Sequence, residues 1–152
     1  MDIKDVLTLP CVRLDGQGNS KKRVLEAAAE LIAEHHITIN ANELFSALLT
    51  REKLGSTGVG NGIALPHCQL PSCAYPVATF IRLSAPLDFD ALDHKPVDLL
   101  FVLVVPPGEK EEHLELLREV ALYLKDPEVQ QALRCNNNAE SVYHTLTAEL
   151  MS

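Results

Sequence analysis

One stretch of this chain, Val97 to Val105, constrains the fold more than any other. Eight of its nine residues are apolar, and most are valine or leucine. Such a run predicts a strand covered on both faces, as in the middle of a sheet flanked by helices. Pro106 and Pro107 end it, because proline cannot continue a strand ladder. The remainder of the chain alternates helical and strand-like patterns, which is typical of an α/β domain.

The neighbouring elements can be placed from apolar spacing and from capping residues. Ser20 or Asn19 can cap one helix, Asn40 a second and Asp126, before Pro127, a third. We expect the first helix to end at about His36, the second at about Lys53 and the third to be short. Two further helices are expected over Glu109–Lys125 and Val142–Leu150. We expect strands over Val12–Leu14, Gly62–Cys68 and Val77–Leu83, besides the apolar run.

Length and charge narrow the function classes. The 152 residues favour a single domain, 1–152. The net charge of −8 argues against sequence-independent nucleic-acid binding and against docking on an anionic membrane, but leaves a basic protein partner open. The first residues do not resemble a signal peptide, and no stretch approaches the roughly 18 apolar residues of a membrane span. We therefore expect a cytoplasmic protein with no membrane insertion.

The four cysteines are scattered along the chain, at positions 11, 68, 73 and 135. Without an export signal we expect free thiols rather than disulfides. His67 with Cys68 and Cys73 would be an alternative metal site, but zinc would need a fourth ligand. We therefore expect no metal.

A glycine-rich segment, Gly55 to His67, carries the strongest functional signal. It holds four of the chain's seven glycines and leads through Pro66 to a histidine. It lacks the Gly-Lys-Ser/Thr of a P-loop and the spacing of a dinucleotide fingerprint, so we expect no nucleotide cofactor, and no cofactor at all. Glycine-rich backbone can approach an anion and donate N–H groups to it. We therefore expect these residues to stabilise a phosphoryl group: Ser56, Thr57, Gly58, Gly60, Asn61 and Gly62.

Three side chains are candidates for the chemistry itself. The imidazole of His67 is a good nucleophile near neutral pH and can carry a phosphoryl group. His113 lies near the start of the helix after the apolar strand, where α/β sites form, although a core histidine is the alternative. Arg51 could hold phosphoryl oxygens bidentately, although a solvated residue at a helix end is the alternative.

The segment Arg51–His67 resembles the active-site signature of the IIA proteins of the bacterial phosphotransferase system, mannitol/fructose type. The nitrogen-regulatory branch is the most similar. Pro86–Asp93, Pro96–Phe101 and His113-Leu114 extend the resemblance, which covers about residues 5–148. It implies a single domain in which helices flank a mixed central sheet. It also implies that His67 is phosphorylated and that His113 and Arg51 are the other active-site residues.

The resemblance further implies a donor and a role. The donor would be a small HPr-like phosphocarrier protein, charged from phosphoenolpyruvate through enzyme I. The phosphorylation state would control binding to regulatory protein targets such as potassium-transport and sensor-kinase proteins. Two alternatives remain open: a sugar-specific IIA component that passes phosphate to a transporter IIB domain, and a docking module without phosphotransfer. Cys68 departs from the pattern, because relatives commonly have glycine after the histidine.

Overall fold

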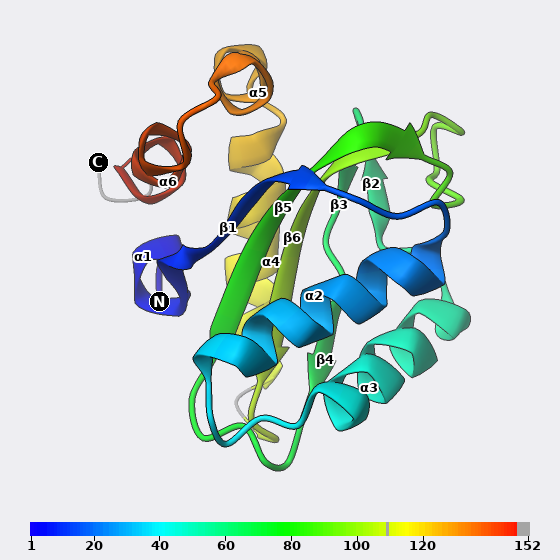
Figure 1. The fold of residues 1–152 in the computed structure, drawn as a ribbon, viewed down its shortest axis with the longest axis vertical. Helices are drawn as coiled ribbons and strands as arrows, with labels where there is room; N and C mark the ends of the chain where they lie inside the picture. The colour runs from blue at the N-terminus through cyan, green and yellow to red at the C-terminus, as the bar shows by residue number, and fades with distance from the viewer. Residues whose placement is uncertain (109, 149–152) are drawn as a thin grey trace.

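A six-stranded mixed sheet runs through the protein, with helices on both of its faces (Figure 1). The structure is a computed structural model that describes residues 1–108 and 110–148. The sheet confirms the predicted α/β class, and its parallel and antiparallel pairs confirm the mixed arrangement that the family resemblance implied.

The predicted central strand is β6 (Val97–Val105), and the whole sheet is assembled around it. Eight of its residues are buried, with Asp98 partly exposed. One edge of β6 pairs antiparallel with β5, and the other edge pairs in parallel with two short strands. The remaining strands complete the order β1-β5-β6-β3-β2, with β4 also on β6: β1 (Leu7–Gly16), β2 (Gly58–Gly60), β3 (Ile63–Ala64), β4 (His67–Gln69) and β5 (Val77–Leu87).

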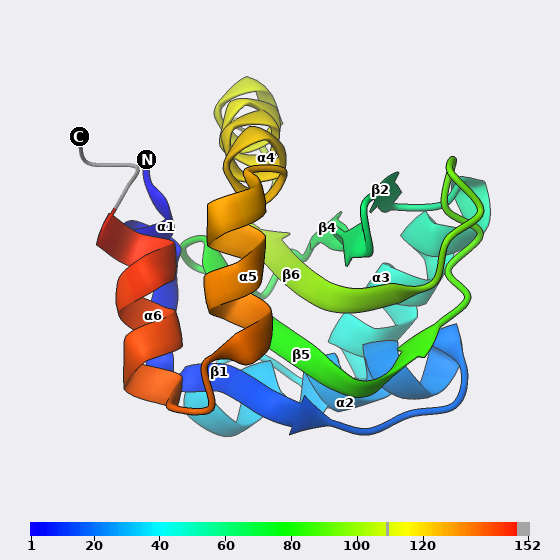
Figure 2. The same cartoon turned by 90° about the horizontal axis from the view of Figure 1, so that it is seen from above.

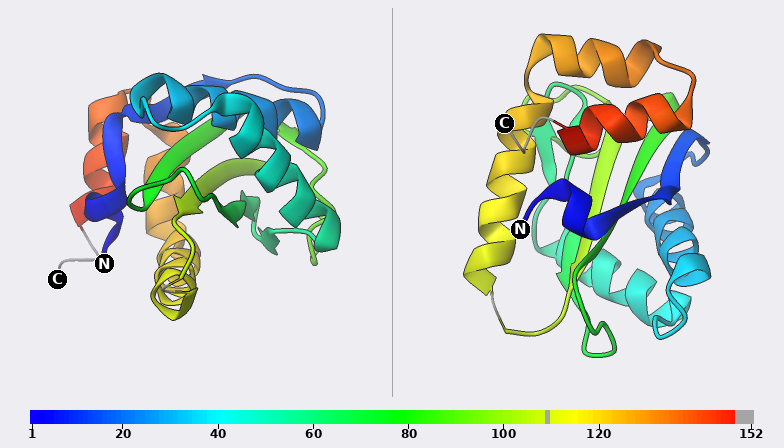
Figure 3. Two further views of the ribbon diagram at one scale, coloured as in Figure 1. Left: turned by 90° about the horizontal axis from the view of Figure 1, so that it is seen from below. Right: turned by 90° about the vertical axis from the view of Figure 1, so that its left-hand side faces the viewer.

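The helices cover the sheet in two layers, each with its own hydrophobic core (Figures 2 and 3). Alternate residues of β6 serve the two cores: Phe101 and Leu103 face one, whereas Leu100 and Val102 face the other. The first core packs against α1 (Ile3–Val6), α4 (Lys110–Leu124), α5 (Pro127–Cys135) and α6 (Ala139–Ala148). The second packs against α2 (Lys21–His35) and α3 (Ala41–Leu54), which lie side by side.

Local capping confirms where three helices begin. Ser20 accepts a hydrogen bond from the Arg23 amide, and Asn40 accepts one from the Glu43 amide. Asp126 accepts one from the Glu128 amide just before Pro127 begins its helix. These side chains satisfy amides that have no partner within the first helical turn, which is why short-range sequence patterns located these starts.

Several boundaries differ from the predictions. β1 is much longer than Val12–Leu14, and α1 was not anticipated, because four residues carry no usable periodicity. β5 continues past Leu83 through a register shift until Leu87 pairs with Val97. Two predicted helix boundaries, Glu109 and Leu150, lie outside the described residues.

The glycine-rich segment folds into a β-hairpin between β2 and β3. Asn61 and Gly62 form its turn with φ values of 59° and 79°. Both lie in the left-handed region, as a two-residue hairpin turn of type I′ requires, and Asn-Gly is the preferred pair there. Arg134 of α5 holds the turn, because it donates to the Asn61 carbonyl at 2.7 Å and pairs with Asp98 at 2.8 Å.

In the part of the chain that the structure covers, no helix combines the length and apolar character needed to cross a membrane.

The hairpin turn has little room for a side chain at Gly62. We expect Gly62→Ala to lower the free energy of unfolding by about 1–3 kcal/mol, because alanine is strained at this positive φ. Its Cβ would also lie 2.5 Å from Arg134 Nη2 and 2.9 Å from Asp98 Oδ1. Urea unfolding measures the effect. Gly55→Ala is the matched control, since a Cβ there meets nothing within 4 Å, and an equal loss in both variants would contradict the explanation.

Candidate active site

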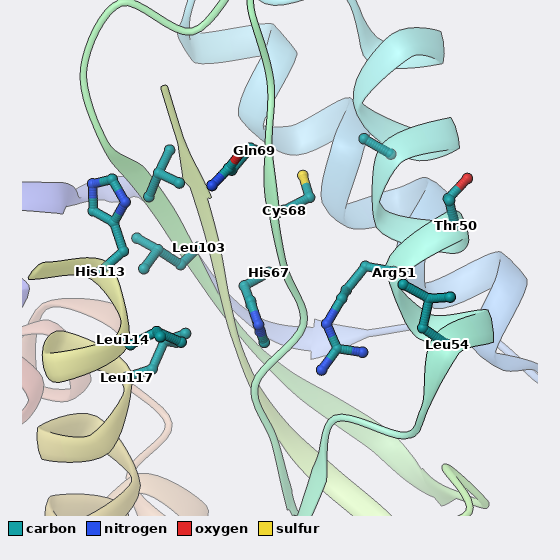
Figure 4. A pocket seen from close by; sticks show the side chains of 12 residues that line it. Thr50, Arg51, Leu54, His67, Cys68, Gln69, Leu103, His113, Leu114 and Leu117 are labelled. Carbon is teal, nitrogen blue, oxygen red and sulfur yellow. The ribbon is translucent and has the colours of Figure 1, made fainter. Parts of the chain in front are cut away.

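An open cavity of about 550 Å³ lies between α3 and α4, beside the start of β4. Arg51, His67 and His113, the three predicted catalytic residues, all line it. In Figure 4, Arg51 comes from α3 on one side of His67 and His113 comes from α4 on the other. An apolar wall that was not predicted from the sequence surrounds them: Ala47, Leu54, Leu103, Val105, Leu114 and Leu117.

The backbone fixes the tautomer of His67. Its Nδ1 lies 2.8 Å from the carbonyl oxygen of Leu65. A carbonyl only accepts hydrogen bonds, so Nδ1 carries the proton in this contact. In the neutral ring the lone pair is therefore on Nε2, which makes Nε2 the nucleophilic atom. β4 holds the backbone beneath this ring, with His67 opposite Leu103 of β6.

The surroundings of His67 keep it neutral. Burial lowers the pKa of His67 below its usual value of 6.5, and the nearby positive charge of Arg51 lowers it further. The Leu65 hydrogen bond and the Glu52 carboxylate act in the opposite direction, but they do not outweigh burial. The imidazole is therefore largely unprotonated near neutral pH, as a nucleophile must be.

Arg51 lies in the last turn of α3, where its guanidinium is held locally. Its Nη1 donates to the carbonyl oxygen of Gly55 at 2.9 Å. This contact satisfies a carbonyl just beyond the helix end and leaves other N–H groups of the fork available for an anion. The side chains of Arg51 and His67 extend next to each other in Figure 4.

His113 lies in the first turn of α4 and is only 4% exposed. Neither of its ring nitrogens has a hydrogen-bond partner among the described residues. Buried polar atoms are nearly always hydrogen-bonded, so this ring is unusual for a core histidine. His113 lines the cavity, and the N-terminus of its helix favours an anion nearby.

The predicted phosphoryl-stabilising residues of the hairpin have other partners. The Ser56 hydroxyl donates to the Phe89 carbonyl at 2.5 Å, and the Thr57 hydroxyl donates to Glu52 at 2.6 Å. The amides of Gly58 and Asn61 donate to Ser56 Oγ and to Asp93. The described lining of the cavity includes none of the six, so contact of a phosphoryl group with them stays a prediction: Ser56, Thr57, Gly58, Gly60, Asn61 and Gly62.

Glu52, a carboxylate that is only 6% exposed, was not predicted from the sequence. It accepts hydrogen bonds from the amide and hydroxyl of Thr57 and pairs with Lys21 of α2 at 3.1 Å. One signal could have found it. Leu44 and Leu48 face the core at four-residue spacing, and Glu52 occupies the next position in that series.

The cysteines around the site are free, as predicted. Cys68 lines the cavity next to His67, but burial raises the pKa of its thiol to about 12, with a further contribution from Cys73. It therefore stays a neutral thiol, which argues against a redox role. Nor do any three His, Cys, Asp or Glu side chains in the described chain stand close enough to hold a metal ion.

A family model for the phosphoenolpyruvate-dependent sugar phosphotransferase system, EIIA 2, matches residues 5–149. The chain belongs to this family. Among curated EIIA relatives, the nitrogen regulatory protein of Pseudomonas aeruginosa is 50% identical over 141 residues, which cover 93% of this chain and 92% of that protein. The predicted resemblance to the nitrogen-regulatory branch is therefore confirmed.

Solved structures agree with this assignment. The crystal structure of nitrogen regulatory protein IIA-Ntr from Neisseria meningitidis superposes with a TM-score of 0.89 at 38% identity, covering 95% of this chain and 99% of that one. Enzyme IIA mannitol from Escherichia coli, solved in complex with phosphorylated enzyme IIB mannitol, gives a TM-score of 0.77. Its 18% identity, over 93% of this chain and 98% of that one, supports the shared fold alone.

The electrostatic influence of Arg51 on His67 can be measured. We expect Arg51→Gln to raise the pKa of His67, because it removes a positive charge that disfavours the imidazolium. An NMR titration of the ring resonances reports it. Lys53→Gln removes one charge from the same helix end, at a residue outside the cavity lining, and serves as the control. A His67 pKa that moves equally in both variants would show that the effect is not specific to Arg51.

Proposed function

We propose that this EIIA protein accepts a phosphoryl group on Nε2 of His67 and works mainly as a regulator. The observation that carries the proposal is the hydrogen bond from His67 Nδ1 to the Leu65 carbonyl, because it leaves the Nε2 lone pair free in a cavity that Arg51 and His113 also line. Membership of the phosphotransferase family supports the chemistry. The nitrogen regulatory relatives support the regulatory role.

The transfer needs no acid or base from the protein. The Nε2 lone pair attacks phosphorus while the bond between phosphorus and the donor's imidazole nitrogen breaks, and the donor ring leaves with that electron pair. His67 keeps the proton on Nδ1 throughout, where the Leu65 carbonyl stabilises the positive charge that the substituted ring acquires. Arg51 and His113 supply hydrogen-bond donors to the phosphoryl oxygens, which carry the negative charge of the transition state.

The partners follow from the same proposal. The donor would be an HPr-like phosphocarrier protein, and the net charge of −8 favours the approach of a basic carrier. The regulated partners would be transport or sensor-kinase proteins that distinguish the two phosphorylation states. Nitrogen regulatory relatives favour this role over a sugar-specific component that supplies a IIB domain.

We expect the wild-type protein to gain one acid-labile phosphoryl group when incubated with phosphoenolpyruvate, enzyme I and an HPr-like carrier, as seen by intact mass. His67→Ala should gain none, because the nucleophile is missing. His144→Ala removes an exposed histidine of α6 and should behave like wild type. Phosphorylation of His67→Ala would refute the site, and an unmodified wild type beside a charged carrier would favour the docking module.

His113 should affect the rate rather than the end point. We expect His113→Ala to accept the phosphoryl group roughly 100-fold more slowly, because one donor to the transition state is lost. Rapid-quench measurements of transfer from the charged carrier give the rate. An unchanged rate would assign His113 to packing alone.

A further inference from the structure

Glu52 is an unexpected residue for the position that it occupies. A carboxylate on the core face of α3 replaces the apolar residue that packing would favour. Burying a charge is costly unless it is paired and hydrogen-bonded. Glu52 meets this condition with three donors: the Thr57 amide at 3.0 Å, the Thr57 hydroxyl at 2.6 Å and Lys21 Nζ at 3.1 Å.

A series of hydrogen bonds through the backbone connects Glu52 to His67. The Thr57 carbonyl accepts a hydrogen bond from the Leu65 amide at 2.9 Å. The Leu65 carbonyl in turn accepts the Nδ1 proton of His67 at 2.8 Å. The residue that sets the tautomer and direction of the imidazole is therefore itself held by Thr57, whose amide and hydroxyl both bind the Glu52 carboxylate.

Glu52 also secures the turn that holds Arg51, through its backbone as well as its side chain. The Gly55 amide donates to the Glu52 carbonyl at 3.2 Å, so the turn from Gly55 to Thr57 is attached to Glu52 at both of its ends. The carbonyl of Gly55 is the acceptor for Arg51 Nη1. Both groups that would meet the phosphoryl group thus depend on one short segment, which the backbone carbonyl of Glu52 holds at one end and its side chain holds at the other.

We propose that Glu52 is a positioning residue, whose buried carboxylate holds Thr57 and thereby sets the His67 imidazole and the Arg51 guanidinium relative to each other. Glu52 does not line the described cavity. Apart from its charge, which acts to raise the pKa of His67, it acts through Thr57 and the turn. The proposal rests on the proposed function for its effect on transfer, whereas its effect on the geometry of His67 stands apart from that function.

Lys21 provides the charge balance of this arrangement. It bridges Glu52 and Asp90, at 3.1 and 3.0 Å, and its ammonium group lies over the ring of Phe89. Burial lowers the pKa of Lys21, but its hydrogen bonds to Asp90 and Glu52 outweigh burial and raise it overall. Asp90 is largely exposed, and the described hydrogen bonds of the Thr57 amide and hydroxyl go to Glu52, so the network contains a second carboxylate that can serve as a control.

We expect Glu52→Gln to lower kcat for phosphoryl transfer roughly 100-fold while KM for the carrier stays unchanged, because the reacting groups are misplaced and the docking surface is not. In the amide, the oxygen can face only one of the two Thr57 groups. Its NH₂ group then faces either the Thr57 amide, which cannot accept, or the Thr57 hydroxyl, which can accept only by no longer donating to residue 52. The ¹⁵N resonances of His67 should change from the pure Nδ1–H tautomer to a mixture. Asp90→Asn makes the same chemical change in the exposed carboxylate and should match wild type in all three measurements.

Substitutions at Thr57 test the contact between Glu52 and Thr57 from the other partner. They also provide a test if Glu52→Gln does not fold. Thr57→Val keeps the shape and the amide but removes the hydroxyl, and should reproduce both the slower transfer and the mixed tautomer. Thr57→Ser keeps the hydroxyl and should restore both. A folded Glu52→Gln or Thr57→Val with wild-type kcat and a pure His67 tautomer would overturn the proposal. If the wild type takes no phosphoryl group, the proposed function fails, and the tautomer measurement still decides the role of Glu52.

Discussion

Pairing of β6 on both edges and its burial on both faces are the constraint on which the remainder of the structure depends. β5 occupies one edge, and β3 and β4 share the other. A strand in this environment must be apolar at nearly every position, and its alternate side chains must satisfy two separate cores. The short strand that carries His67 has β6 as its partner in the described sheet, so the position of the proposed nucleophile depends on a strand that is almost entirely buried.

The glycine-rich segment illustrates how one sequence pattern can serve two physical purposes. Closely spaced glycines are compatible with an anion-binding loop and with a tight hairpin, because both need positive φ values. Here Asn61 and Gly62 form the hairpin turn, and Arg134 and Asp93 hold it by contacts to the Asn61 backbone. The segment leads to Leu65 and to His67, which lies on β6, and the amides of Gly58 and Asn61 already have partners within the fold.

Local signals located several elements, whereas features that depend on contacts between distant segments were not foreseen in detail. The apolar run located β6, and Ser20, Asn40 and Asp126 located helix starts, because each signal acts over a few residues. Arg51, His67 and His113 were named from their chemistry and position and again from a family resemblance, and the structure brings them to one cavity. The role of Glu52 could not be foreseen, because it depends on Lys21 and Thr57 folding against it from different elements. The tautomer of His67 depends likewise on a backbone carbonyl whose direction no pattern encodes.

The two hydrophobic cores have a consequence for how the protein can communicate its state. Arg51 belongs to a helix of one layer and His113 to a helix of the other, with His67 between them at the sheet (Figure 4). A phosphoryl group on Nε2 of His67 would thus lie next to both layers. Two partners with unrelated shapes, one touching α3 and the other touching α4, could each read the same chemical event from its own side of the molecule.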